Sequence, residues 1–136
     1  MTSMAESFEQ AGEKFDKLSE EADRTADGIK RVLLSDLSDP LRQEYIDTMG
    51  SGVSEAEQAA GLKKMRDKIL QRIKKMDENP NEPHKDGQPH AHMPTYLLFA
   101  ETHLHDLIQE LTNKFAFEVQ RDLMRTLADA YRQPGQ

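Results

Sequence analysis

The sequence predicts an all-α fold, with two long amphipathic helices and two shorter ones packed as a helical bundle or a coiled-coil-like assembly. Apolar residues recur at spacings of three and four along most of the chain, and no segment shows the strict alternation of a strand. Hydrophobic residues make up 36% of the sequence and charged residues 32%. Long helices suit this composition, because only one stripe of each helix needs burial. We therefore expect one all-helical domain over residues 1–136, elongated and oligomeric.

The first long helix is predicted over residues 3–34, which contain no proline. Its apolar or small residues follow the a and d spacing of a heptad repeat: Phe8, Ala11, Phe15, Leu18, Ala22, Thr25, Ile29 and Val32. The acidic residues between them predict a face exposed to solvent: Glu9, Glu13, Asp16, Glu20, Glu21, Asp23 and Asp27. The apolar stripe fits packing against another helix of the same chain as well as it fits a parallel coiled coil.

A short second helix is predicted over residues 39–49. Ser38 is suited to cap its beginning, and Pro40 suits its first turn, where the missing N–H has no partner to lose. The sequence Gly50-Ser51-Gly52 then ends the helix.

The third helix is predicted over residues 55–76. Ser54 and Glu57 match a capping box, in which the serine side chain accepts from the Glu57 N–H and Glu57 reaches back. The apolar stripe of this helix is Leu62, Met65, Ile69, Ile73 and Met76. Residues 77–93 are rich in proline and histidine, and they predict a long loop.

The last helix is predicted over residues 94–131, with Pro94 in its first turn. Its first half carries a single stripe: Leu97, Ala100, Leu104, Leu107, Ile108, Leu111 and Phe115. A second face then begins with Phe117, Met124 and Tyr131, and Val119, Leu123 and Leu127 fill the side between. A helix that is apolar on several faces is surrounded by neighbours. We therefore expect residues 115–131 at the centre of the structure or between subunits.

Residues 62–76 reverse the charge of a chain whose net charge is −7. One acid, Asp67, is outnumbered there by basic residues: Lys63, Lys64, Arg66, Lys68, Arg72, Lys74 and Lys75. Such a helix can contact the phosphates of nucleic acid, or less favourably those of an anionic lipid head group or another acidic partner, and residues 39–76 allow a loose helix-turn-helix. The cations are spread around the helix and lack aromatic neighbours that would stack on bases. This favours the alternative, pairing with the acidic first helix.

The histidines cluster late in the sequence: His84, His90, His92, His103 and His105. His103 and His105 point in different directions on a helix, so they cannot hold one metal ion together. The weak candidates for a metal site are His90, His92, Glu101 and His105, because the last two share a helix face. Zinc-peptidase and di-iron patterns are missing, so no metal site is predicted. A pH-sensing role is a further alternative, since histidine titrates near ~6.5.

The sequence contains no cysteine, which excludes disulfides, thiolate metal sites and cysteine nucleophiles. It has neither a phosphate-binding glycine loop nor a Gly-x-Ser-x-Gly elbow. No apolar run is long enough for a transmembrane helix, and residues 1–10 lack the features of a signal peptide. We therefore expect a cytoplasmic protein that is not an enzyme and needs no cofactor.

Together these features predict a non-catalytic protein-interaction protein, such as an oligomeric adaptor, small chaperone, inhibitor or assembly component, that acts through apolar helix faces. The expected partner is a second copy of the chain, another protein, or both. The expected interface combines two helices: Phe8, Phe15, Leu18, Ile29, Phe117, Met124, Leu127 and Tyr131. The alternative is an accessory nucleic-acid-binding protein that uses residues 62–76. The second alternative is a histidine-based metal or pH sensor.

Overall fold

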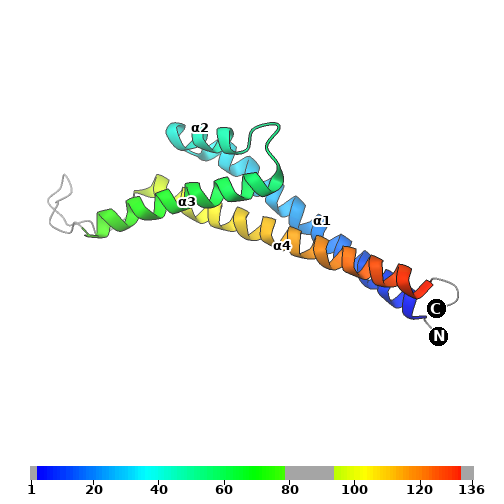
Figure 1. Cartoon of the computed structure of the whole chain (residues 1–136). Helices are drawn as coiled ribbons and strands as arrows, with labels where there is room; N and C mark the ends of the chain where they lie inside the picture. The colour runs from blue at the N-terminus through cyan, green and yellow to red at the C-terminus, as the bar shows by residue number, and fades with distance from the viewer. Residues whose placement is uncertain (1–2, 79–93, 133–136) are drawn as a thin grey trace. The chain divides into compact units, whose positions relative to one another are not determined.

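Four helices make up 91% of the residues described by the computed structural model, which are residues 3–78 and 94–132. They are α1 (Met4–Asp36), α2 (Asp39–Thr48), α3 (Glu55–Glu78) and α4 (Thr95–Arg132), as labelled in Figure 1. Residues 3–78 and 94–132 contain no strand. The predicted all-α fold is confirmed.

The helix ends lie within two residues of the predicted ones. α1 continues to Asp36, and α3 continues to Glu78, so the first two residues of the predicted loop 77–93 are helical. The other residues of that loop, 79–93, lie outside the described residues. Pro94 immediately precedes α4 instead of occupying its first turn, and its carbonyl accepts from the backbone N–H groups of Leu97 and Leu98.

The predicted capping groups differ in outcome. The Ser54 hydroxyl accepts from the backbone N–H of Glu57 at 3.2 Å, as the capping box predicts. Ser38 occupies the N-cap position of α2, but its side chain makes no capping bond, so that prediction is wrong. A capping hydroxyl accepts from the second or third N–H of the helix, and Pro40 removes the second. Gly52 has φ +86°, which suits the turn that follows α2.

The chain divides into two compact units, and each is described by itself. The hairpin unit comprises Met1–Asp27 and Gln109–Gln136, and the bundle unit comprises Gly28–Ile108. α1 and α4 each contribute one part to either unit, whereas α2 and α3 belong to the bundle unit alone.

The bundle unit has a conventional core of large aliphatic side chains. Its buried residues come from all four helices: Leu33, Leu37, Leu41, Tyr45, Leu62, Met65, Ile69, Ile73, Leu97, Ala100, Leu104 and Leu107. The predicted stripe of α3 is therefore buried, apart from the half-buried Met76. α2 and α3 approach closely at Gly61, where an added Cβ would lie 2.6 Å from the Thr48 methyl carbon.

The hairpin unit pairs the beginning of α1 with the end of α4 in antiparallel orientation. The ring centroids of Phe8 and Tyr131 are 5.5 Å apart, and those of Phe15 and Phe117 are 6.5 Å apart. Most buried residues of this unit are small: Ala5, Gly12, Ser19, Ala22, Ala26 and Ala128, with Leu111 beside them. Small side chains let two helices approach closely, but they bury little apolar surface.

Candidate interaction surface

Ion pairs line the contact between the two helices of the hairpin unit. Arg121 Nη1 lies 3.1 Å from Asp16 Oδ1, and Lys114 Nζ lies 3.1 Å from Asp23 Oδ1. Three of the α1 acids predicted to face solvent, Glu9, Asp16 and Asp23, thus pair with basic residues of α4. The prediction of a wholly solvated acidic face is wrong at these positions, because α4 offers matching cations.

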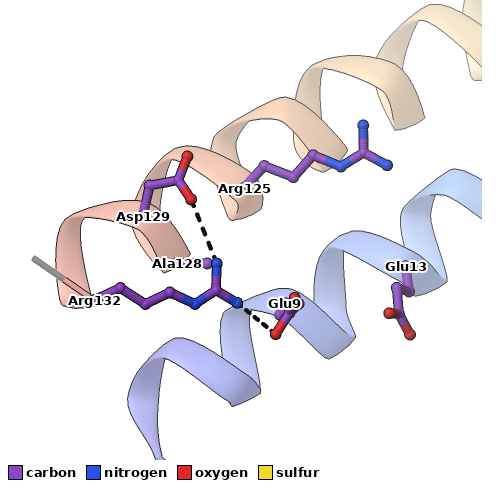
Figure 2. Close-up of a pocket in the computed structure, with 6 residues that line it drawn as sticks. All are labelled: Glu9, Glu13, Arg125, Ala128, Asp129 and Arg132. Carbon is purple, nitrogen blue, oxygen red and sulfur yellow. Dashed lines mark hydrogen bonds and ion pairs between the residues drawn. The ribbon is translucent and has the colours of Figure 1, made fainter.

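The open end of the hairpin unit holds a small polar cleft of about 330 Å³. Figure 2 shows Arg132 between two carboxylates, those of Glu9 on α1 and Asp129 on α4. Further along the same contact, hydrogen bonds with Asp16, and then with Asp122, raise the pKa of Arg121 above its usual value. Oppositely charged groups of α1 and α4 therefore meet along the contact between the two helices.

The last part of α4 separates its charged residues from its uncharged ones. With about 100° of turn per residue, the charged residues among 112–132 fall within an arc of about 100°. They are Lys114, Glu118, Arg121, Asp122, Arg125, Asp129 and Arg132. The remaining arc of about 260° carries no charged residue between positions 112 and 132. The ion pairs with α1 place the charged arc toward α1, so much of the uncharged arc faces away from it.

A seam of exposed residues follows this uncharged side at heptad spacing. It comprises Thr112, Ala116, Val119, Leu123, Thr126 and Ala130, and all six are exposed. Val119 is 66% exposed and Leu123 is 48% exposed, so two large apolar side chains four residues apart are open to solvent on this side of α4. We call these six residues the α4 seam. Spacing of this kind is typical of the contact line between two helices.

Most of the predicted interface residues belong to the hairpin unit. Seven of the eight belong to it, and only Ile29 belongs to the bundle unit. Six of the seven are half-buried, whereas Tyr131 is 57% exposed despite its contact with Phe8. The expectation that residues 115–131 lie at the centre of the structure does not hold for a single chain, because α1 is their one neighbour within this unit and Val119 and Leu123 stay exposed.

The basic residues of α3 are partly engaged within the bundle unit. Two guanidinium nitrogens of Arg66 lie 3.1 and 2.9 Å from Glu101 Oε1, and Lys68 lies 3.3 Å from Glu44. These acids belong to α4 and α2, so for both cations the predicted pairing with the first helix is wrong. Arg72 donates to the Tyr96 hydroxyl at 3.1 Å.

The five lysines of α3 share its solvent-facing side, whereas Arg66 and Arg72 lie beyond either edge of this group, so the seven cations together spread over about 240° of the helix, as expected. Five lysines are exposed: Lys63, Lys64, Lys68, Lys74 and Lys75. At about 100° per residue they lie within an arc of about 140°, opposite the buried stripe. The helix is therefore amphipathic in the ordinary sense, with an apolar face inside and lysines outside.

Two of the five histidines, His103 and His105, lie among the described residues. The His103 ring is 4.1 Å from the Phe99 ring, and its Nδ1 atom is 2.9 Å from the Phe99 carbonyl oxygen. Of the weak metal candidates, His105 is exposed and Glu101 is occupied by Arg66, while His90 and His92 lie outside the described residues, as does His84. Residues 3–78 and 94–132 contain no group of three side chains suited to hold a metal ion.

Two surface features were missed by reasoning from the sequence. One is the α4 seam, whose heptad spacing is visible but weak because Thr and Ala carry little apolar signal. The other is a groove in the bundle unit beside Tyr45, formed by parts of three helices. Its residues belong to separate segments, so no local pattern marks it.

None of the helices in the described part of the chain is long and apolar enough to cross a membrane. Comparison with protein-family models, with curated proteins and with solved structures returned no match.

Proposed function

We propose that this chain is a non-catalytic interaction protein that associates with a second copy of itself through the hairpin unit. The supporting observation is the uncharged outer side of α4, on which Val119 and Leu123 stand exposed at heptad spacing. In this proposal, the α4 seam of one chain packs against the α4 seam of its partner. A cytoplasmic setting is part of the proposal, and a sequence without cysteine is compatible with it.

The energetic argument concerns what two helices can cover. A pair of helices buries one face of each, and here that shared face is used by small residues and ion pairs. The large apolar residues of the α4 seam, Val119 and Leu123, remain exposed. Two hairpins packed together form a four-helix bundle, which is the common way to bury such groups. The α4 seam spans 18 helical steps, or about 27 Å, which is enough for several heptad layers.

A second copy of the chain suits this surface better than a foreign partner. Charged groups across an interface select particular partners, and the α4 seam carries none. A two-fold dimer instead places the same surface on both sides, so an uncharged stripe matches itself. Alanine and threonine in the seam allow close approach, while Val119 and Leu123 supply apolar area.

Light scattering coupled to size-exclusion chromatography tests the proposal. The wild-type chain should be a dimer at tens of micromolar, and Val119→Glu combined with Leu123→Glu should weaken association at least about 100-fold, because four charges would meet in one contact. The matched control is Val32→Glu with Leu98→Glu, which changes an exposed valine and an exposed leucine of the bundle unit. The control variant should remain dimeric. A strictly monomeric wild-type chain, or equal dissociation by both variants, would overturn the proposal.

A second candidate function is supported by the exposed lysines on one side of α3, which suit contact with the phosphates of nucleic acid. A mobility-shift assay at low salt with duplex DNA and single-stranded RNA is the direct test. Lys63→Glu with Lys64→Glu should abolish any retardation, whereas Lys14→Glu with Lys17→Glu, which alters exposed lysines of α1, should preserve it. If the wild-type chain gives no salt-sensitive shift, this function is excluded.

A further inference from the structure

The bundle unit contains a mainly apolar groove of about 400 Å³ between α1, α2 and the beginning of α3. Its apolar lining comes from α1 and from the end of α2: Leu34, Ile46 and Met49. Leu34 is 50% exposed and Ile46 is 41% exposed, although both are large aliphatic residues next to a well-packed core. The groove therefore leaves apolar surface open to solvent at a defined place.

Tyr45 lines the same groove and provides a hydrogen-bonding group there. The residue is only 4% exposed, yet its hydroxyl has no hydrogen-bond partner among the described residues. The hydroxyl is not fully covered by other atoms, and Tyr45 is part of the groove lining. Burial raises the pKa of Tyr45 to about 12, so the phenol stays protonated well above neutral pH. The groove thus offers a donor that lacks an acceptor.

The charged residues that line the groove are both basic, Lys30 and Arg31. Arg31 is exposed, and the structure records no acidic partner for it among residues 3–78 and 94–132. Gln58, the polar residue contributed by α3, already donates to the Met49 carbonyl at 3.4 Å. A ligand for this groove therefore needs an apolar part for the floor and an anionic acceptor for the tyrosine and arginine.

We propose that the groove beside Tyr45 binds a small amphiphile with a single apolar chain and a carboxylate. The chain would lie on Leu34, Ile46 and Met49, and the carboxylate would accept from the Tyr45 hydroxyl and pair with Arg31. The volume is at the lower end of the range of about 300–1,000 Å³ found for ligand sites, which suits a medium-length alkyl chain rather than a bulky cofactor. This site is separate from the surface proposed for self-association, and neither proposal depends on the other.

Amide-resolved NMR titration of the full chain with decanoate, below the concentration at which it forms micelles, tests the site. Decanoate should saturate with one-to-one stoichiometry and shift amides around residues 30–34 and 45–50. Decanol should bind at least about tenfold more weakly, because it cannot pair with Arg31. Decyltrimethylammonium, with the opposite charge, should not saturate in the same range.

Variants separate the specific groove from general apolar attraction. Tyr45→Phe removes only the unpartnered hydroxyl and should weaken decanoate binding about tenfold, and Arg31→Glu should weaken it more. The matched controls Tyr131→Phe and Arg24→Glu alter exposed residues of the hairpin unit and should bind like the wild-type chain.

Three results would each overturn the proposal: no saturable binding of decanoate to the wild-type chain, equal binding of all three amphiphiles, or unchanged affinity in both groove variants. Amide shifts confined to residues 112–131 would likewise place the amphiphile on the hairpin unit and refute the site beside Tyr45.

Discussion

The hairpin unit and the bundle unit use the same kind of helix in opposite ways. In the bundle unit, large aliphatic residues such as Leu104 and Ile69 are buried, and lysines face solvent. In the hairpin unit, small residues and ion pairs occupy the contact, and large apolar residues such as Val119 remain outside. A helix surface is covered only where neighbouring helices surround it. Within the hairpin unit each helix has one neighbouring helix, whereas the bundle unit combines parts of four helices. We infer that one unit is a core and the other is an interface.

α4 makes the contrast within a single element. Its first half has Leu97, Leu104 and Leu107 fully buried, while Leu123 in its second half is 48% exposed. Leucine occurs in both halves, so the type of residue alone does not explain the difference in burial. The basic residues of the second half pair with acids of α1, and these ion pairs leave the uncharged side facing away from α1.

The largest expected difference between the units concerns the same substitution at two leucines of α4. Leu104→Ala should lower the free energy of unfolding by about 3–5 kcal/mol, because it leaves a cavity in a closed core. Leu123→Ala should change that of the single chain by less than about 0.5 kcal/mol. Urea denaturation at protein concentrations low enough to keep the chain monomeric measures both. Equal losses would contradict the distinction between core and interface.

Two glycines of the bundle unit should respond with opposite signs to replacement by alanine. Gly61→Ala should destabilise the fold by about 1–3 kcal/mol, because the new methyl group would collide with Thr48. Gly28→Ala should stabilise it by about 0.5–1 kcal/mol, because an added Cβ meets nothing within 4 Å and alanine favours the helix. Thermal unfolding followed by circular dichroism gives the comparison. If Gly61→Ala were also stabilising, the close approach of α2 to α3 would be refuted.

The coupling free energies of ion pairs should differ less between the two units. Arg66 and Glu101 are 29% and 20% exposed in their side chains, so a double-mutant cycle with Arg66→Met and Glu101→Gln should give a coupling of about 1 kcal/mol. Arg132 and Glu9 are about half exposed, and their coupling should be about 0.2–0.5 kcal/mol. Added salt should reduce the second value proportionally more than the first. A larger coupling in the hairpin unit would reverse the comparison.

The smallest effect near neutral pH is expected from Tyr45. Burial raises its pKa from 10.0 to about 12, so the unfolded chain ionises first as the pH rises above 10. The folded state should therefore be fully stabilised below pH 10 and lose stability between pH 10 and 12. Tyr45→Phe should remove this part of the loss and leave stability at neutral pH nearly unchanged. Urea midpoints measured from neutral to alkaline pH check the prediction, and identical alkaline losses in both proteins would contradict it.

The sequence by itself determined the helices and most of their ends. Spacings of three and four residues, the Ser54 cap and the Gly50-Ser51-Gly52 turn are local signals, and local signals act through backbone geometry within one or two turns. The buried face of α3 was predictable for the same reason, because its apolar residues form one narrow stripe between lysines. The apolar residues of α1 and α4 that we expected at an interface were also visible as heptad patterns, although the way in which the two helices meet was not.

Only the tertiary structure decided which face of each helix is covered in the hairpin unit and which groups gather at the groove of the bundle unit. Asp16 and Arg121 are far apart in the sequence, and so are Leu34 and Gln58, so no periodicity links them. The covered face of a helix with several apolar sides depends on its neighbours. Here the small residues of α1 and the ion pairs selected the charged side of α4, and Val119 and Leu123 were left facing out.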